Sequence, residues 1–340
     1  MKVAINYNYV NDAFGGGNRF YYDLQDYLIR NKNIVTNNLD QNDIDIILIM
    51  DPRHTSPHFT FGIKEVINYI KLINPSCLVV HRINECDERK NTKFMNFHLK
   101  IINYYADHTV FIASWLKDLN LWINNKPNST ILNGVNKNIF FRKSISKIIP
   151  KKFKIVTHHW GGNYLKGFDI YKYLDENLAN TELSNIFSFT YIGNKPKGVI
   201  FNNIIYKEPM NGKELANELR NHHIYLTASI NEPGGMHHIE GASCGLPLLY
   251  RNSGALPEYC NGFGVQFENQ KDFLSKLLKL RDNYYHYQIK IKKYNQDSEY
   301  VSKSYLKLFE KLCKNKKFLS KRRRFNNLFF NLIVRFIPYV

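Results

Sequence analysis

Glu232-Pro-Gly-Gly-Met-His-His-Ile-Glu240-Gly-Ala-Ser-Cys-Gly-Leu-Pro247 is the stretch of this 340-residue chain that decides the fold. An apolar segment typical of a β-strand, Ile224–Ser229, comes just before it, and a second one, Pro247–Tyr250, follows. The order is therefore strand, glycine turn, short helix and strand, which is one crossover unit of an α/β sheet.

The residue types in this turn indicate a ligand that carries both charge and hydroxyl groups. A turn of this kind directs a helix N-terminus, with its free N–H groups, at the carboxyl edge of the sheet, where an anion such as phosphate binds well. A carboxylate would repel phosphate, so we expect Glu232 to contact a neutral, hydroxyl-rich part of the same ligand.

The spacing of the two carboxylates, eight positions apart, resembles the Glu-x7-Glu signature of retaining family-4 glycosyltransferases, which have the GT-B fold. The resemblance covers residues 1 to about 270 and is strongest over Tyr225–Glu258. It implies that Glu232 contacts the hydroxyls of the donor sugar and that Glu240 accepts from the ribose hydroxyls of the nucleotide. The turn residues that would join them in the nucleotide-sugar site are Gly234, Gly235 and Met236.

Three further segments carry the resemblance. Gly16 and Gly17 follow the first predicted strand, where backbone N–H groups can approach the donor diphosphate. Lys166 precedes a glycine after the first strand of the second half, where the family has a pyrophosphate-binding lysine. His81 is expected at a strand end near the reacting sugar, so that Glu232, His81 and Lys166 are the candidate catalytic residues.

The predicted phosphate-binding site departs from the family pattern at one position. The arginine that usually precedes the lysine by five residues is replaced by Gly161. A histidine of the preceding His158-His159-Trp160 segment, Arg251 or Arg19 could supply the missing group.

Alternation of strand and helix patterns predicts two tandem Rossmann-like domains, the GT-B architecture, with a cleft between their strand ends. Residues 1–141 form the predicted acceptor-side domain and residues 151–313 the predicted nucleotide-sugar donor domain. The lysine-rich stretch 142–154 is the predicted linker, and Asn133-Gly134-Val135 is interpreted as the architectural segment that closes the first domain.

The net charge of +18 favours anionic partners, and residues 314–340 carry eight Lys or Arg with no acid. This tail is predicted to form a basic amphipathic helix. Its proposed apolar stripe consists of Phe325, Leu328, Phe329, Leu332, Ile333 and Phe336. Such a helix lies on an anionic membrane surface or packs back on the first domain, and the sequence leaves both alternatives open.

Composition also bounds the compartment and the cofactors. Five scattered cysteines, the lack of a visible secretory signal and the lack of a membrane-spanning run predict a cytoplasmic protein, with peripheral attachment to the membrane through the tail. The adjacent His237 and His238 point about 100° apart on a helix, so we expect no metal and no other cofactor.

These observations predict a retaining glycosyltransferase that moves a sugar from a nucleotide-sugar donor to a glycan or lipid-linked acceptor, in envelope polysaccharide or glycoconjugate synthesis. A sugar-nucleotide 2-epimerase of similar fold is the enzymatic alternative. The other alternative is a non-catalytic basic protein that binds membranes or nucleic acid, although no recognised nucleic-acid module is present.

Overall fold

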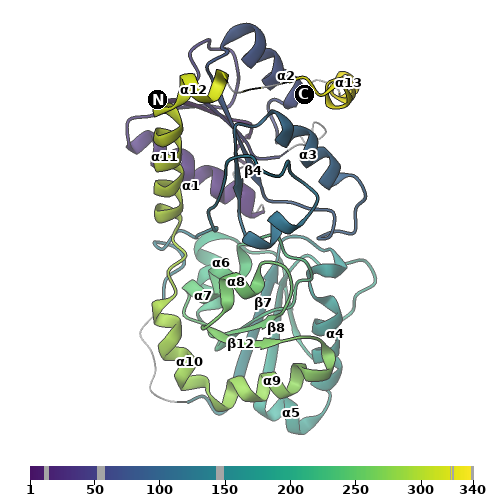
Figure 1. The fold of residues 1–340 in the computed structure, drawn as a ribbon. Helices are drawn as coiled ribbons and strands as arrows, with labels where there is room; N and C mark the ends of the chain where they lie inside the picture. Colours follow the sequence, from purple (N-terminus) through teal and green to yellow (C-terminus); the bar gives the residue numbers. More distant parts are fainter. Residues whose placement is uncertain (11–14, 52–57, 143–148, 322, 324, 338–340) are drawn as a thin grey trace. The chain divides into compact units, whose positions relative to one another are not determined.

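The computed structural model covers residues 1–340 and describes all of them except 11–14, 52–57, 143–148, 322, 324 and 338–340 (Figure 1). The chain forms two compact units. One comprises Met1–Asn11, Gly17–Leu132 and Ser298–Val340, and the other comprises Asp12–Gly16 and Asn133–Asp297. Residues 143–148 of the predicted linker at 142–154 lie outside the described residues.

The first unit is built on a parallel six-stranded sheet with the order β2-β1-β3-β4-β5-β6. Its strands are β1 (Lys2–Ile5), β2 (Ile34–Thr36), β3 (Ile46–Ile49), β4 (Leu78–Ile83), β5 (His108–Phe111) and β6 (Asn128–Thr130). All residues of β3, β4 and β5 are buried, as expected for parallel strands that are covered on both faces.

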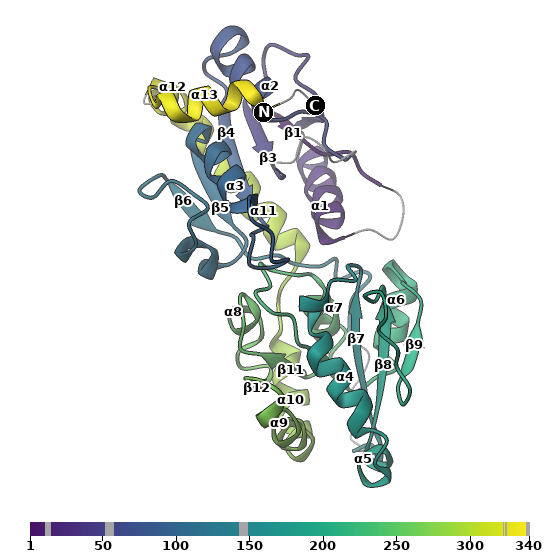
Figure 2. The ribbon, with the colours of Figure 1, turned by 90° about the vertical axis from the view of Figure 1, so that its right-hand side faces the viewer.

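Helices cover both faces of this sheet. Their bounds are α1 (Gly16–Arg30), α2 (Ile63–Asn68), η1 (Tyr69–Ile73), α3 (Met95–Tyr105), η2 (Ser114–Asp118), α11 (Ser298–Lys314), α12 (Lys316–Lys321) and α13 (Leu328–Phe336). On one face α1 and α11 lie side by side, and Phe20 packs against Tyr305 with ring centroids 5.1 Å apart (Figure 1). On the other face lie α2, α3 and α13 (Figure 2).

The second unit repeats the design with the strand order β12-β11-β10-β7-β8-β9, again all parallel. Its strands are β7 (Phe153–His159), β8 (Phe187–Gly193), β9 (Ile205–Lys207), β10 (Ile224–Thr227), β11 (Leu248–Arg251) and β12 (Gly264–Phe267). Its helices are η3 (Tyr164–Lys166), α4 (Phe168–Asn177), α5 (Thr181–Ile186), α6 (Gly212–Leu219), α7 (His237–Ser243), α8 (Leu256–Cys260), α9 (Gln270–Asp282), α10 (Tyr284–Lys290) and η4 (Ile291–Lys293).

Two parallel α/β sheets, each layered with helices, confirm the predicted pair of Rossmann-like domains. Apart from the short segment Asp12–Gly16, the second unit is formed by one stretch, Asn133–Asp297, after which the chain returns to the first unit at Ser298. Helix α11 belongs to the first unit, since its apolar face packs on the same side of the first sheet as α1.

The predicted C-terminal helix is divided into α12 and α13. Arg323, between them, is buried against Asp107, whereas Arg322 and Arg324 lie outside the described residues. Within the described residues, no helix combines the length and the apolar character that crossing a bilayer requires.

Candidate functional site

The candidate site lies at the carboxyl ends of β7 and β10, two neighbouring strands of the second sheet. Strand order reverses at this pair, because β8 and β9 extend the sheet on the side of β7 while β11 and β12 extend it on the side of β10. In open α/β sheets, ligands bind at this switch point. Lys166 follows β7 and Glu232 follows β10, so the topology brings the two residues to one edge.

Lys166 and Glu232 form a buried ion pair. The Lys166 Nζ donates to the Glu232 Oε2 at 2.6 Å, and the two side chains are only 11% and 3% exposed. Backbone hydrogen bonds fix both ends, because the Lys166 N–H donates to the Asn163 carbonyl and the Ala255 N–H donates to the Glu232 carbonyl. At such burial each charge needs the other, so a ligand that enters here must offer groups that replace this contact.

The side chain of an asparagine binds the backbone of the glycine turn that follows Glu232. The Asn133 Nδ2 donates to the Gly234 carbonyl at 2.6 Å, and its backbone N–H donates to the Tyr259 hydroxyl at 2.7 Å. A Cβ atom added to Gly235 would lie 3.0 Å from the Glu232 carboxyl carbon and 2.6 Å from His237 Nδ1. The turn therefore needs glycine at 235 in order to lie so close to the carboxylate.

Glu240, on α7, is oriented by a histidine from the end of β7. The His158 Nε2 lies 2.6 Å from the Glu240 Oε2, and the His158 Nδ1 lies 3.0 Å from the Tyr225 hydroxyl. The His158 backbone N–H also donates to this hydroxyl, which leaves the hydroxyl proton for Nδ1. In the neutral ring the Nε2 then carries the proton and donates to Glu240.

The residue after Glu240 must be small. A Cβ atom added to Gly241 would lie 2.2 Å from the Tyr225 ring, so only glycine lets α7 approach β10 this closely. The close approach places Glu240 and Tyr225 each within hydrogen-bond distance of the His158 ring, although His158 and Glu240 are 82 residues apart in sequence.

Three more histidines fill the space behind the site. Burial is the largest cause that holds the pKa of His159 and His237 well below the usual value, and the nearby Lys166 lowers both further. Burial lowers the pKa of His238 to about 3, and neither of its ring nitrogens has a hydrogen-bond partner. These three rings are neutral at neutral pH, so none of them supplies the positive charge of the missing arginine.

The sequence also suggested two arginines as replacements for the missing one. Arg251, at the end of β11, is buried and paired with Asp169. Arg19 lies on α1 of the first unit. Lys166 is thus the cation in contact with Glu232 in the second unit.

Sequence reasoning placed His81 incorrectly within its strand. It was expected at a strand end, in a polar cluster outside the core, but it lies inside β4 and is fully buried. Its Nδ1 faces the Asn103 side-chain amide of α3 at 3.5 Å, and burial lowers its pKa to about 3. The ring is therefore a neutral part of the first sheet's interior.

The predicted glycine loop begins α1. Helix α1 starts at Gly16, and a Cβ atom added to Gly17 would meet nothing within 4 Å. Asn18 fixes the start of this helix through two hydrogen bonds with the backbone of Val10. Phe14, at the beginning of the predicted loop, lies outside the described residues.

The second unit therefore brings together Lys166, Glu232, the glycine turn with Met236, and Glu240, whereas His81 and Gly17 belong to the first unit. Sequence reasoning ranked His158 below Lys166 and treated Asn133 as architectural only. His158 was suggested as one replacement for the missing arginine, but its contact with Glu240 depends on which strand neighbours β10, which the sequence did not show.

No cluster of three or more His, Cys, Asp or Glu side chains suited to a metal ion occurs within the part of the chain that the structure describes. Metal-independent chemistry therefore remains a prediction to be tested on the protein.

Comparison with known proteins gives the site a context. Residues 200–298 match the family model described as Glycosyl transferases group 1, and the matched segment includes Glu232 and Glu240. A search of curated proteins finds no match to this sequence.

Solved structures of similar fold come from several bacteria. HepE of Anabaena in complex with UDP-glucose is 12% identical, with a TM-score of 0.67 over 92% of this chain and 100% of that one. Sucrose-phosphate synthase of Thermosynechococcus elongatus is 11% identical, with a TM-score of 0.63 over 92% and 99%. A glycosyltransferase of Rickettsia africae is 13% identical, with a TM-score of 0.62 over 92% and 98%. At these identities the likeness establishes the GT-B fold.

Proposed function

We propose that the protein is a retaining glycosyltransferase that moves a sugar from a nucleotide-sugar donor, of the UDP-glucose type, to a glycan or lipid-linked acceptor. The observation that carries the proposal is the arrangement at the switch point of the second sheet. There the Lys166–Glu232 pair adjoins a glycine turn, and Glu240 is oriented by His158. The group 1 domain match and the UDP-glucose bound to HepE, a protein of similar fold, support the same donor class.

Each group has a distinct task in this proposal. Glu240 accepts hydrogen bonds from the vicinal hydroxyls of the ribose, because one of its oxygens faces His158 and the carboxylate retains further acceptor positions. Lys166 moves from Glu232 to the diphosphate, together with backbone N–H groups of Gly234 and Gly235. Glu232, released from its lysine, accepts from hydroxyls of the sugar.

The reaction places negative charge on the departing nucleoside diphosphate while the sugar becomes oxocarbenium-like. Preorganised N–H donors and a cation stabilise such charge most strongly where water is excluded, and the ion pair here is almost wholly buried. In this proposal Glu232 and Glu240 both accept hydrogen bonds from hydroxyl groups, so neither is assigned the role of a nucleophile. The acceptor then attacks the sugar on the face that the leaving group vacates, with retention of configuration, as the resemblance implies.

The glycine loop and His81 complete the proposal on the first unit. Gly17, with open space where a side chain would stand, keeps the predicted role of offering its backbone N–H to an anion. The buried, neutral His81 supports the sheet behind the acceptor side, so the catalytic argument rests on Lys166 and Glu232.

The test is a panel of nucleotide sugars. Donors that bind the folded protein raise its melting temperature, and the best donor is then incubated with candidate acceptors. We expect stabilisation by a UDP-sugar and, by NMR, a product whose anomeric configuration matches that of the donor. Conversion of the donor into its C2 epimer, without transfer, would instead identify an epimerase. A panel without any stabilising member would refute the proposal.

A further inference from the structure

Helix α13 exposes large apolar side chains on the side that faces away from the core. Its inner face buries Phe330 and Val334 against α2 and α3. The opposite face carries four side chains that are between 51% and 86% exposed, namely Leu328, Phe329, Leu332 and Phe336. Residues at these spacings fall within about 100° of arc, so they form one continuous strip.

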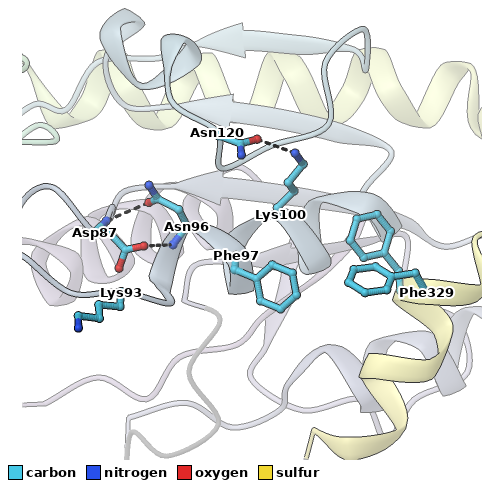
Figure 3. Close-up of a pocket in the computed structure, with 8 residues that line it drawn as sticks. Asp87, Lys93, Asn96, Phe97, Lys100, Asn120 and Phe329 are labelled. Carbon is cyan, nitrogen blue, oxygen red and sulfur yellow. Dashed lines mark hydrogen bonds between the residues drawn. The ribbon is translucent and has the colours of Figure 1, made fainter.

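A neighbouring helix widens the apolar strip. Phe97 of α3 is 39% exposed, and its ring centroid lies 6.3 Å from that of Phe329. A pocket of about 360 Å³ lies beside these rings, and Phe97, Phe329 and Phe330 are among the residues that line it (Figure 3). Exposed aromatic rings grouped in this way are uncommon on a monomer surface and mark a contact site.

Cations surround the strip. Lys93 and Lys100 line the pocket (Figure 3), and the Lys64 Nζ donates to the Arg335 carbonyl on α13 at 3.2 Å. Lys71 stands 5.6 Å from the centre of the Phe325 ring, which leads into α13.

The acidic groups of this region are already engaged. Asp87 also lines the pocket, but its carboxylate accepts from the backbone N–H groups of Met95 and Asn96 and thereby caps the start of α3. Glu88 accepts from the side-chain amide of Asn96. Both carboxylates keep their negative charge, but the cations of this region outnumber them, namely Lys64, Lys71, Lys93, Lys100 and Arg335. A partner at the edge of the strip therefore meets a net positive charge.

Charge decides which partner fits this surface. A second copy of the chain would bring a like-charged surface, because the whole chain carries +18 and residues 314–340 contain no acid. An anionic bilayer offers hydrocarbon for the rings and phosphates for the lysines, with each cation near the surface contributing about 1 kcal/mol. A nine-residue helix is ~13 Å long, so it can lie in the interface but cannot span the bilayer.

We propose that the outer face of α13, together with Phe97 and the cations around it, is a docking surface of the first unit for an anionic lipid bilayer. The strip enters the boundary between headgroups and acyl chains, while Lys93 and Lys100 meet lipid phosphates beside the pocket. Such docking would place the proposed enzyme at a membrane surface, but the docking proposal does not depend on the proposed catalytic activity.

The test is co-sedimentation of the full chain with vesicles of phosphatidylcholine alone, or of phosphatidylcholine mixed with phosphatidylglycerol, at low and high salt. We expect binding to the anionic vesicles that persists in part at high salt. The variant Leu332→Ser/Phe336→Ser should bind at least roughly tenfold more weakly at high salt, because it removes two exposed apolar side chains. Lys93→Gln and Lys100→Gln should each weaken low-salt binding roughly fivefold and leave the high-salt component unchanged.

Tyr300→Ser is the matched control, since Tyr300 on α11 is a 68% exposed aromatic residue outside the strip. It should bind like the unaltered protein, and every variant should keep the original melting temperature. Equal binding by the Leu332→Ser/Phe336→Ser variant and the unaltered chain would overturn the proposal. A concentration-dependent dimer that this variant abolishes, without vesicle binding, would assign the strip to self-association instead.

Discussion

Replacing Glu240 by alanine should weaken the binding of the nucleotide-sugar donor while the protein stays folded. In the structure one carboxylate oxygen of Glu240 lies 2.6 Å from His158, and the side chain is 14% exposed, so a ligand can reach it. A carboxylate accepts about four hydrogen bonds, which leaves capacity for the two hydroxyls of a ribose.

The size of the effect follows from the bonds that are lost. Hydrogen bonds to a charged acceptor contribute about 1.5–3 kcal/mol. At about 1.4 kcal/mol for each factor of ten, the dissociation constant should rise roughly 10- to 150-fold. Isothermal titration calorimetry with the best-stabilising donor measures this change directly, with circular dichroism as the check of folding.

Variants of His158 test the same ribose contact through its hydrogen bond to Glu240. His158→Ala should weaken donor binding less than Glu240→Ala, because it frees the carboxylate without removing it, and His158→Gln should recover part of the loss by keeping an N–H donor. The double variant should show strong non-additivity, since the two residues act through one contact. Glu214→Ala, on an exposed position of α6, is the control. A donor affinity unchanged by Glu240→Ala would refute the assignment of the ribose contact.

Four further outcomes are expected. Glu232→Ala should lower the turnover number, because the transition state loses about 1.5–3 kcal/mol of stabilisation, and donor affinity should change less. A loss of donor affinity with unchanged turnover would contradict the placement of Glu232 at the sugar. Transfer should continue in EDTA, and complete inhibition that added metal reverses would exclude the metal-independent mechanism. Below pH 6.5 the unfolded chain protonates His238 while the folded ring, with its pKa near 3, stays neutral. As the pH is lowered below 6.5, His238 should therefore reduce the free energy of unfolding by about 1.4 kcal/mol per pH unit. Urea unfolding at several pH values should show that this free energy declines less steeply with falling pH in His238→Phe than in the unaltered protein. Arg323→Met should reduce the free energy of unfolding by about 3–5 kcal/mol, because Asp107 would remain buried without the guanidinium that donates to it at 2.8 Å; a chemical denaturation curve that matches the unaltered protein would argue against this pair.

The sequence was sufficient for the fold and for the turn that carries the site, because both are local patterns. Buried parallel strands appear as short apolar runs, and the segment from Ile224 to Tyr250 contains its strand, glycine turn and helix in one continuous stretch. The resemblance put Lys166 and Glu232 in one donor site, whereas their direct ion pair was not predicted.

Contacts between segments that are distant in sequence could not be predicted from such local patterns. The pairing of His158 with Glu240 depends on which strand neighbours which, and on how closely α7 approaches Tyr225. His81 was misplaced because polar residues at the end of an apolar run resemble a strand end, while the paired register extends β4 through Ile83. Which face of α13 is buried could not be predicted either, because apolar residues occur on both faces and the helical period alone does not select one of them.

The return of the chain to the first unit has a consequence for the order in which the protein is made. One face of the first sheet, which includes Val3 and Ile5, is completed by α11, whose residues follow the whole of Asn133–Asp297. At ~5–20 residues per second a ribosome needs on the order of ten seconds or more to synthesise that segment. When this segment is complete the second unit has all its strands, whereas this face of the first sheet is covered by α1 alone until α11 follows. The nascent first unit, rather than the second, is therefore where we expect chaperones to bind.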